Sequence, residues 1–163
     1  MKKYVKYFLF TAILLSGVYS CDKNEKDAEA ALLSEYLKEH NITQEPTADG
    51  LYLVESGFST SGYPDYDFPA EGDTVLIAYK GYLLADTSVV FDEKSIYKPA
   101  RYAYLKDDVI PGWEEAVGMM KKNVPVLIII PSDLAYGGDR TGIIPPYSTL
   151  IFEAKITDII KAR

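Results

Sequence analysis

Near the middle of the chain stands Val109-Ile110-Pro111-Gly112-Trp113-Glu114-Glu115-Ala116-Val117, which contains the only tryptophan of the sequence. Its Pro-Gly pair ends an extended segment and begins a helix. Glu114 and Glu115 fall in the first turn, where the helix dipole favours carboxylates. Apolar residues then recur on one helical face, at Trp113, Ala116, Val117 and Met120. The segment therefore predicts a short helix packed against a sheet, with the indole as the floor of a pocket.

The composition favours one globular domain that is rich in β-strands. The chain has 163 residues, of which 48% are apolar and 25% are charged, and these proportions suit a single domain with appendages. It contains 14 tyrosines and 6 phenylalanines. Because aromatic residues are enriched in strands and carry large apolar surfaces, we expect a β-rich fold with an aromatic interior or groove.

Residues 1–20 are typical of a signal peptide. Lysines at positions 2, 3 and 6 precede residues 7–20, which carry no charge and are too few to span a membrane comfortably. The segment ends Val18-Tyr19-Ser20-Cys21, which is similar to a bacterial lipoprotein signal, so we expect lipidation of Cys21, the only cysteine. The alternative is an ordinary secretory signal that leaves Cys21 as a free thiol.

A lipid anchor would hold a soluble domain on a membrane without a spanning helix. We therefore expect a location in the cell envelope of a gram-negative bacterium, at the periplasmic face or the cell surface. The charged run of residues 22–27 is either a surface-export signal or a plain solvated tether. Without residues 1–20, 14 basic and 24 acidic residues leave a net charge of −10 and no Lys/Arg cluster, so we expect no nucleic-acid binding.

Residues 28–40 are predicted to form a helix within the segment 21–48 that precedes the main domain. Its apolar residues fall near one face, at Ala28, Ala31, Leu32, Tyr36 and Leu37. A helix of this length is marginal in isolation, so it packs either on the domain or on a second copy, as in a homodimer. His40, the only histidine, is interpreted as a solvated residue at the helix end.

The main domain is predicted over residues 49–163 and has an α+β fold. Five or six antiparallel strands with one short helix across them follow from the alternation of apolar and polar residues. In the second strand Tyr79 points to the same side as Val75 and Ile77. Residues 56–72, rich in Gly, Ser, Pro and Asp, predict a long surface loop. The predicted strands are residues 51–55, 74–84, 89–92, 99–105, 124–131 and 148–161, with a turn at residues 85–88.

The residue types of this domain exclude most catalytic schemes. From Asp49 onward there is no histidine and no cysteine, so Ser-His-Asp and Cys-His catalysis and a His/Cys metal site are excluded there. There is no Gly-rich phosphate loop, because Gly137-Gly138 precedes a loop of aliphatic residues rather than a helix. We therefore expect no cofactor and no metal, and any reaction must proceed without a nucleophile or a proton relay.

Rotation about an X–Pro amide is a reaction that meets these conditions. Its barrier of roughly 18–20 kcal/mol corresponds to about 0.01 s⁻¹ at the upper end, and no backbone bond is broken. A dry aromatic pocket lowers this barrier, because polar solvent stabilises the charge-separated planar amide more than the twisted one. A hydrogen-bond donor to a substrate carbonyl can hold one end of the bond fixed.

The chain resembles the FKBP-type peptidyl-prolyl isomerases over residues 49–160. The segment 109–116 is similar to the central signature of that family. Further matches follow the same order along the chain, at Phe91-Asp92, Ala135-Tyr136-Gly137, Gly142-Ile143-Ile144-Pro145-Pro146 and Thr149-Leu150-Ile151-Phe152-Glu153. With residues 135–137 and 142–146 counted as one stretch, four motifs in order at suitable spacing make the resemblance specific.

The resemblance implies a curved antiparallel sheet wrapped around the short helix, with a pocket between them for proline-containing polypeptides and macrolide-type ligands. It implies catalytic roles for Trp113 under the proline ring, for the Tyr136 hydroxyl as a donor, and for Asp92, held by Tyr79, near the twisting amide. The implied substrate-binding residues are Tyr79, Phe91, Val109, Ile110 through its backbone N–H, Ile143, Ile144 and Phe152.

Each residue also has a plainer interpretation. Tyr79, Phe91 and Phe152 could be core aromatics, Asp92 a turn residue, and Trp113 a plug between helix and sheet.

The sequence also departs from the family pattern at several places. Ala100 stands where the family usually has a phenylalanine at the pocket edge, and Arg140 lies near a position where many members have histidine. The segment from Tyr79 to Phe91 is about two residues longer than usual, and the loop after Tyr136 about one shorter. These departures concern substrate preference and efficiency rather than the fold.

Three functions remain open at this point. The leading hypothesis is a lipid-anchored isomerase that assists the folding of exported proteins, since X–Pro isomerisation is slow enough to limit folding. The alternatives are a non-catalytic module that binds proline-containing segments and a self-associating lipoprotein with a vestigial pocket.

Overall fold

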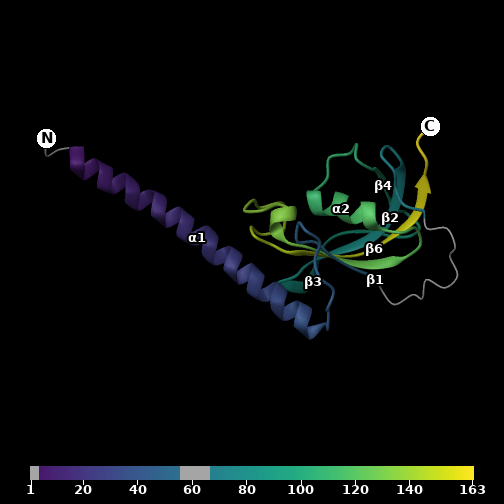
Figure 1. Cartoon of the computed structure of the whole chain (residues 1–163), viewed down its shortest axis with the longest axis horizontal. Helices are drawn as coiled ribbons and strands as arrows, with labels where there is room; N and C mark the ends of the chain where they lie inside the picture. Colours follow the sequence, from purple (N-terminus) through teal and green to yellow (C-terminus); the bar gives the residue numbers. More distant parts are fainter. Residues whose placement is uncertain (1–3, 56–66) are drawn as a thin grey trace.

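The computed structural model describes residues 4–55 and 67–163, with side chains from residue 22 onward in those ranges. A six-stranded antiparallel sheet carries the domain, with the strand order β1-β5-β6-β2-β3 and with β4 also paired to β2. Figure 1 shows the short helix α2 lying across one face of this sheet and the long helix α1 projecting away from the domain. The predicted α+β fold is confirmed. The elements are α1 (Tyr4–Glu39), β1 (Tyr52–Glu55), β2 (Thr74–Leu83), β3 (Asp86–Lys94), β4 (Ala100–Ala103), α2 (Pro111–Met119), β5 (Pro125–Ile130), a 3₁₀ turn η1 (Ser132–Leu134) and β6 (Leu150–Ile160).

Strands β2 and β6 form the centre of the sheet, and their alternation builds the main core. They pair antiparallel from Thr74 opposite Ile160 to Leu83 opposite Leu150. Side chains on the α2 side are buried at Val75, Ile77, Leu83, Leu150, Phe152, Ala154 and Ile156. The face predicted from the alternation in these strands is therefore the face that packs against α2.

Strand β3 contains two irregularities that absorb the extra length noted between Tyr79 and Phe91. Gly81 pairs with Asp92 and Tyr82 with Val90, while Leu83 already pairs with Asp86. The predicted turn at residues 85–88 is therefore displaced, because the turn lies at residues 84–85 and β3 begins at Asp86. The carboxylate of Asp86 accepts hydrogen bonds from the backbone N–H and the hydroxyl of Ser88. These two bonds stabilise the start of β3, next to the turn.

Helix α2 begins where the sequence predicts, with Pro111 in its first turn and Ile110 as the N-cap residue. Proline suits this position because its missing N–H would have no helical partner. The structure explains why glycine stands at position 112, which the sequence did not show. A Cβ at this position would lie 2.4 Å from Cγ2 of Ile130 in β5. Glycine at this position lets the helix and the sheet approach closely, with the buried face of α2 formed by Gly112, Trp113, Ala116 and Val117.

Helix α1 differs from the prediction in its extent. The solvated tether predicted over residues 22–27 is wrong in one respect, because these residues are exposed but helical. Opposite charges four residues apart, such as Asp22 with Lys26, support a helix on an exposed surface. Among the described residues, no helix is long and apolar enough to cross a membrane. The side chain of Cys21 and most of the predicted loop, residues 56–66, lie outside the described part of the chain.

The described contacts of α1 with the domain run from Lys26 to Leu37, at the end of the helix that Figure 1 shows beside the domain. Leu33, Tyr36 and Leu37 pack on the outer face of the sheet, where Ile129 and Ile151 are buried. The apolar run of β5 is explained by this second contact, because both faces of that strand are covered. The other residues predicted on this helical face, Ala28, Ala31 and Leu32, are exposed. His40 is also exposed, stacked on Tyr36 with 3.9 Å between ring centroids.

Candidate functional site

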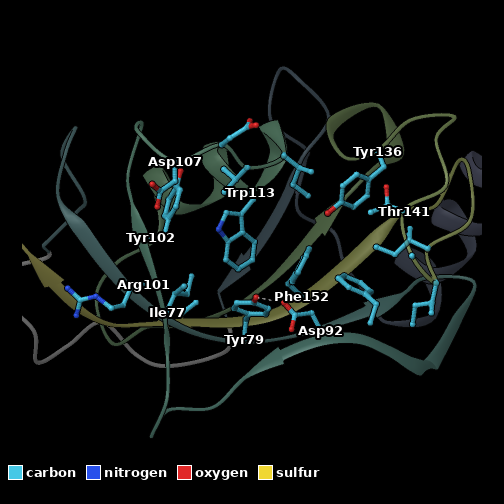
Figure 2. A pocket seen from close by; sticks show the side chains of 18 residues that line it. Ile77, Tyr79, Asp92, Arg101, Tyr102, Asp107, Trp113, Tyr136, Thr141 and Phe152 are labelled. Atoms are coloured by element: carbon cyan, nitrogen blue, oxygen red, sulfur yellow. Dashed lines mark hydrogen bonds between the residues drawn. The ribbon is translucent and has the colours of Figure 1, made fainter.

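A pocket of about 800 Å³ lies between α2, the inner face of the sheet and two loops. Figure 2 shows Trp113 at its centre, with Tyr79 and Phe152 from the sheet below and Tyr136 at one side. The structure brings together at this pocket all ten of the residues predicted for it within the domain. These are Tyr79, Phe91, Asp92, Val109, Ile110, Trp113, Tyr136, Ile143, Ile144 and Phe152.

Four aromatic rings from four elements, β2, β3, α2 and β6, form the base of the pocket. The Trp113 ring centroid lies 5.1 Å from that of Tyr79 and 4.8 Å from that of Phe152. Phe91 meets Phe152 edge to face at 5.4 Å. Such edge-to-face pairs are favourable beyond their buried area and fix the ring orientations. Trp113 is only 8% exposed and belongs to the main core, so it plugs the helix–sheet contact and forms the pocket floor at once.

Gly81 makes room for this ring cluster, and the sequence prediction gave it no role. A Cβ at Gly81 would lie 2.6 Å from Cζ of Phe91 and 3.0 Å from Cε1 of Phe152. A glycine at an inward position of a strand often marks a place where another group approaches closely, and this signal was available in the alternation of β2. Gly81 therefore belongs to the structural support of the pocket.

A bulge brings Phe91 and Asp92 to the same pocket although they are neighbours in β3. In a regular strand their side chains would point to opposite faces. The register of β3 shifts between the partners of Gly81 and Tyr82, so that Phe91 is the extra residue. Bulges of this kind redirect side chains, and both residues line the pocket as a result.

The carboxylate of Asp92 is held by two donors. The Tyr79 hydroxyl donates to Oδ2 at 2.5 Å, and Nζ of Lys94 donates to Oδ1 at 2.8 Å. Partial burial opposes ionisation of Asp92, but the hydrogen bonds from Lys94 and Tyr79 outweigh it and lower the pKa of this carboxyl. Burial and the bond to Asp92 raise the pKa of the Tyr79 hydroxyl, which stays protonated as a donor. Lys94 was not predicted as part of this site.

Two residues that line the pocket carry a hydrogen-bond donor without a partner in the described part of the chain. The Tyr136 side chain is 37% exposed, and Figure 2 shows its hydroxyl pointing into the pocket. The backbone N–H of Ile110 precedes α2, whose first turn uses only the carbonyl of this residue, as acceptor for Trp113 and Glu114. Both donors are therefore available to a ligand carbonyl.

The two isoleucines of the loop over the pocket, Ile143 and Ile144, differ in burial. Thr141 and Ile144 close the loop by exchanging backbone hydrogen bonds of 3.1 and 2.9 Å. Ile144 is buried in the core at 5% exposure, whereas Ile143 at the tip is 57% exposed. Ile144 therefore anchors the loop, and Ile143 is the residue that a ligand would cover.

The far wall consists of residues outside the ten predicted for the site, among them Ala100, which the resemblance placed at the pocket edge. Tyr102 is buried, and its hydroxyl donates to Oε1 of Glu114 at 3.0 Å. Burial and, after it, this hydrogen bond raise the pKa of Tyr102. Ala100 also lines the pocket and pairs with Ile77 across β2 and β4. The small side chain of Ala100 thus leaves this wall thin beside Tyr102. The remaining additions are Ile77, Arg101, Asp107, Asp108, Thr141 and Gly142.

This arrangement provides binding and orientation rather than covalent chemistry. It offers apolar ring faces, two free donors and one fixed carboxylate. Within residues 22–55 and 67–163, no group of three or more His, Cys, Asp or Glu side chains could hold a metal ion.

Comparisons with known proteins agree with this geometry. A family model described as FKBP-type peptidyl-prolyl cis-trans isomerase matches residues 66–157. The FKBP-type peptidyl-prolyl cis-trans isomerase FkpA of Escherichia coli strain K12 is 31% identical over 141 residues, which cover 85% of this chain and 48% of FkpA. The outer membrane protein MIP of Legionella longbeachae is 38% identical over 96 residues, which cover 58% of this chain and 40% of MIP.

The fold is also similar to a solved structure. The crystal structure of FkpA from Escherichia coli superimposes with a TM-score of 0.66 at 28% identity, covering 100% of this chain and 75% of that chain. The chain spans about half the length of the curated relatives that it matches, 48% of FkpA and 40% of MIP.

Proposed function

The chain belongs to the family of FKBP-type peptidyl-prolyl cis-trans isomerases, and we propose that it catalyses rotation about X–Pro bonds to assist the folding of exported proteins. The observation that carries this proposal is the aromatic base around Trp113, with the hydroxyl of Tyr136 pointing into the same pocket (Figure 2). Uncatalysed X–Pro isomerisation takes tens of seconds at 25 °C, so a compartment that receives unfolded chains benefits from a catalyst.

The proposed mechanism rests on where the amide is placed. The proline ring lies on the indole of Trp113, and the X–Pro amide is withdrawn from water by the surrounding rings. Because water favours the charge-separated planar amide, this transfer lowers the barrier to twisting. The Ile110 N–H and the Tyr136 hydroxyl hold carbonyl groups of the substrate, so that one side of the bond is fixed while the other rotates.

Asp92 acts on this step as a fixed negative charge. Its two donors hold the carboxylate in one orientation, and a preorganised charge needs no reorganisation as the amide twists. The twisted amide nitrogen is pyramidal and more basic than the planar one, so its local dipole changes beside this charge. No proton is transferred and no bond is broken in this scheme.

A protease-coupled proline-peptide assay of residues 22–163 tests the proposal. Asp92→Asn and Trp113→Leu are expected to lower kcat/KM, whereas Glu93→Gln, on the exposed side of the same strand, is expected to leave it unchanged. Turnover that is equal in all four proteins contradicts the site assignment.

The second candidate function is binding without catalysis, and the thin wall at Ala100 favours it. A wider pocket holds a proline-containing segment less tightly against Trp113, which matters more for the twisted amide than for the planar one. A protein that binds the proline peptide but gives no turnover in the protease-coupled assay is such a non-catalytic binding module. A macrolide-type ligand that competes with the peptide would support the shared pocket in either case.

We propose in addition that Cys21 is lipidated and that the protein is anchored in the cell envelope. Support comes from the lysines at positions 2, 3 and 6, from the uncharged residues 7–20, and from the small residue Ser20 before Cys21. The relative named outer membrane protein MIP is consistent with an envelope location. Metabolic labelling with a radioactive fatty acid should mark the full-length protein and not the Cys21→Ser variant. Equal labelling of the two contradicts the anchor.

The exposed face of α1 supports a homodimer as a further proposal. Ala28, Ala31 and Leu32 are exposed and spaced on one face, and Leu32 is 43% exposed. Size measurement of residues 22–163 should give a dimer and of residues 46–163 a monomer. A monomer in both cases contradicts the proposal.

A further inference from the structure

One carboxylate of α1 reaches into the domain beside the pocket. Oε1 of Glu29 accepts hydrogen bonds from the backbone N–H of Ser132 at 2.7 Å and from the hydroxyl of Thr149 at 2.6 Å. Oε2 accepts from the hydroxyl of Ser132 at 2.6 Å. Ser132 and Thr149 are 1% and 3% exposed, so three buried donors converge on this single side chain, which lies 103 residues before Ser132 in the sequence.

Ser132 in turn holds the segment that carries Tyr136. Its carbonyl oxygen accepts hydrogen bonds from the backbone N–H groups of Ala135 and Gly137, both at 2.9 Å. These two residues flank Tyr136 on either side. The carbonyl of Gly137 then accepts from the N–H of Tyr147 at 2.7 Å, which ties the same segment to the end of the overhanging loop.

We propose that Glu29 is a positioning residue for the Tyr136 hydroxyl, so that the docked α1 helix supports the pocket although none of its described residues lines it. The proposal rests on the isomerase function proposed above, because it assigns to Tyr136 the role of a donor to the substrate. The support runs from Glu29 to Ser132, and from the Ser132 carbonyl to the two amides that flank Tyr136.

Loss of the Glu29 carboxylate would destabilise the fold around Ser132 and Thr149. A buried donor without a partner loses its hydration and gains nothing in return, and removal of Glu29 leaves three such donors. The η1 turn then has to move to reach water or other acceptors, and the segment of Tyr136 moves with it. The neighbouring ion pair of Lys26 with Asp133 is solvent-exposed and is a weak substitute, because exposed pairs contribute little.

The helix is held at this place by contacts that do not involve Glu29. Leu33, Tyr36 and Leu37 pack on the outer face of the sheet one to two turns further along α1. Loss of Glu29 alone should therefore leave α1 docked, and the effect of its substitution reports on the carboxylate rather than on the loss of the helix.

The test compares Glu29→Ala, Glu29→Gln and the control Glu35→Ala in the full-length protein. Glu35 is exposed on the same helix. Glutamine can still accept hydrogen bonds from the Ser132 N–H and Thr149, and its amide can donate to the Ser132 hydroxyl. Amide hydrogen exchange at Ala135 and Gly137 should become about 10-fold faster in Glu29→Ala, with much smaller changes in Glu29→Gln and in Glu35→Ala.

Activity provides the second measurement, through a double-mutant cycle with Tyr136→Phe. Glu29→Ala should lower kcat/KM by about 10-fold, since small misplacements of a catalytic group are costly. In the Tyr136→Phe background the same change should cost less than about twofold, because the hydroxyl that Glu29 positions is already absent.

The outcomes separate this inference from the proposed function. If the unaltered protein shows no turnover, the isomerase proposal fails, and the exchange rates still test whether Glu29 holds the Tyr136 segment. Unchanged exchange at Ala135 and Gly137 in Glu29→Ala overturns the inference. An equal loss of kcat/KM in both backgrounds overturns it as well, since that result indicates a general loss of stability.

Discussion

The hydroxyl of Tyr79 donates a 2.5 Å hydrogen bond to Oδ2 of Asp92, across the antiparallel pair of β2 and β3. The other oxygen of Asp92 accepts from Lys94, so both carboxylate oxygens are engaged. Asp92 is therefore oriented before any ligand arrives, and the ring of Tyr79 is fixed in the aromatic base by the same contact.

The pH dependence of activity should follow from this contact. The folded pKa of Asp92 is lowered, below the usual value of about 3.9, so the carboxylate stabilises the fold above that value. This contribution is lost as the pH falls through the folded pKa. Tyr79→Phe removes one donor and should raise the pKa of Asp92, which moves the acid limb of kcat/KM to higher pH.

The measurement for this prediction is an NMR titration of the Asp92 carboxyl carbon together with the pH–rate profile. Tyr82→Phe is the matched control, because Tyr82 lies on the same strand but packs on the outer face. An unchanged pKa in Tyr79→Phe contradicts the proposed effect of the hydrogen bond.

Trp113 should report ligand binding directly, because it is the only tryptophan of the chain. Binding of a proline peptide is expected to change its fluorescence emission. Trp113→Leu removes the ring contacts with Tyr79 and Phe152 and should lower the free energy of unfolding by at least about 2 kcal/mol. Denaturant unfolding measures the stability, and calorimetry measures peptide binding by this variant. Peptide affinity equal to that of the unaltered protein argues against Trp113 as the pocket floor.

Gly81→Ala should disturb the pocket without touching a ligand. The added Cβ would lie 2.6 Å from Phe91, so the ring must move, at an expected cost of about 1–3 kcal/mol in unfolding free energy. Lys80 precedes Gly81 on the same strand and points to the outer face. Lys80→Ala should change the stability by about 0.5 kcal/mol or less. Thermal unfolding of both variants makes the comparison, and similar losses in the two refute the steric argument.

Ala100→Phe should strengthen the thin wall of the pocket. Ala100 lines the cavity beside Tyr102, and a phenylalanine there can bury additional apolar surface against a bound proline ring. Burial of apolar surface gives about 25 cal/mol per Å², so we expect peptide affinity to rise by about threefold to tenfold. Fluorescence titration of Trp113 measures it. Ala100→Leu separates the effect of size from that of aromaticity, and weaker binding by both variants shows that the space is needed.

Several features could be predicted because they depend on neighbours in the sequence. The inward face of β2, with Tyr79 beside Ile77, follows from alternation of period two. The start of α2 follows from Pro111 and the spacing of its apolar residues. The pocket residues of separate elements were predicted only through the resemblance, because local patterns contain no distance between Trp113 and Phe152.

Other features were missed because they depend on how elements pack. The helical state of residues 22–27 results from α1 continuing through a polar run, which no apolar face marks. Gly112 is a contact residue rather than a turn residue, and its close neighbour Ile130 belongs to another element.

By itself the amino-acid sequence determined the α+β class, the apolar faces and the absence of histidine and cysteine from the domain, since these follow from composition and from spacings of two to four residues. The family resemblance placed Phe91 and Asp92 in one pocket, but only the tertiary structure gave the physical reason, a shifted register between β2 and β3. The tertiary structure also decided that Glu29 meets Ser132. Partners 103 positions apart are brought together by the packing of α1 on the sheet, which no local pattern contains.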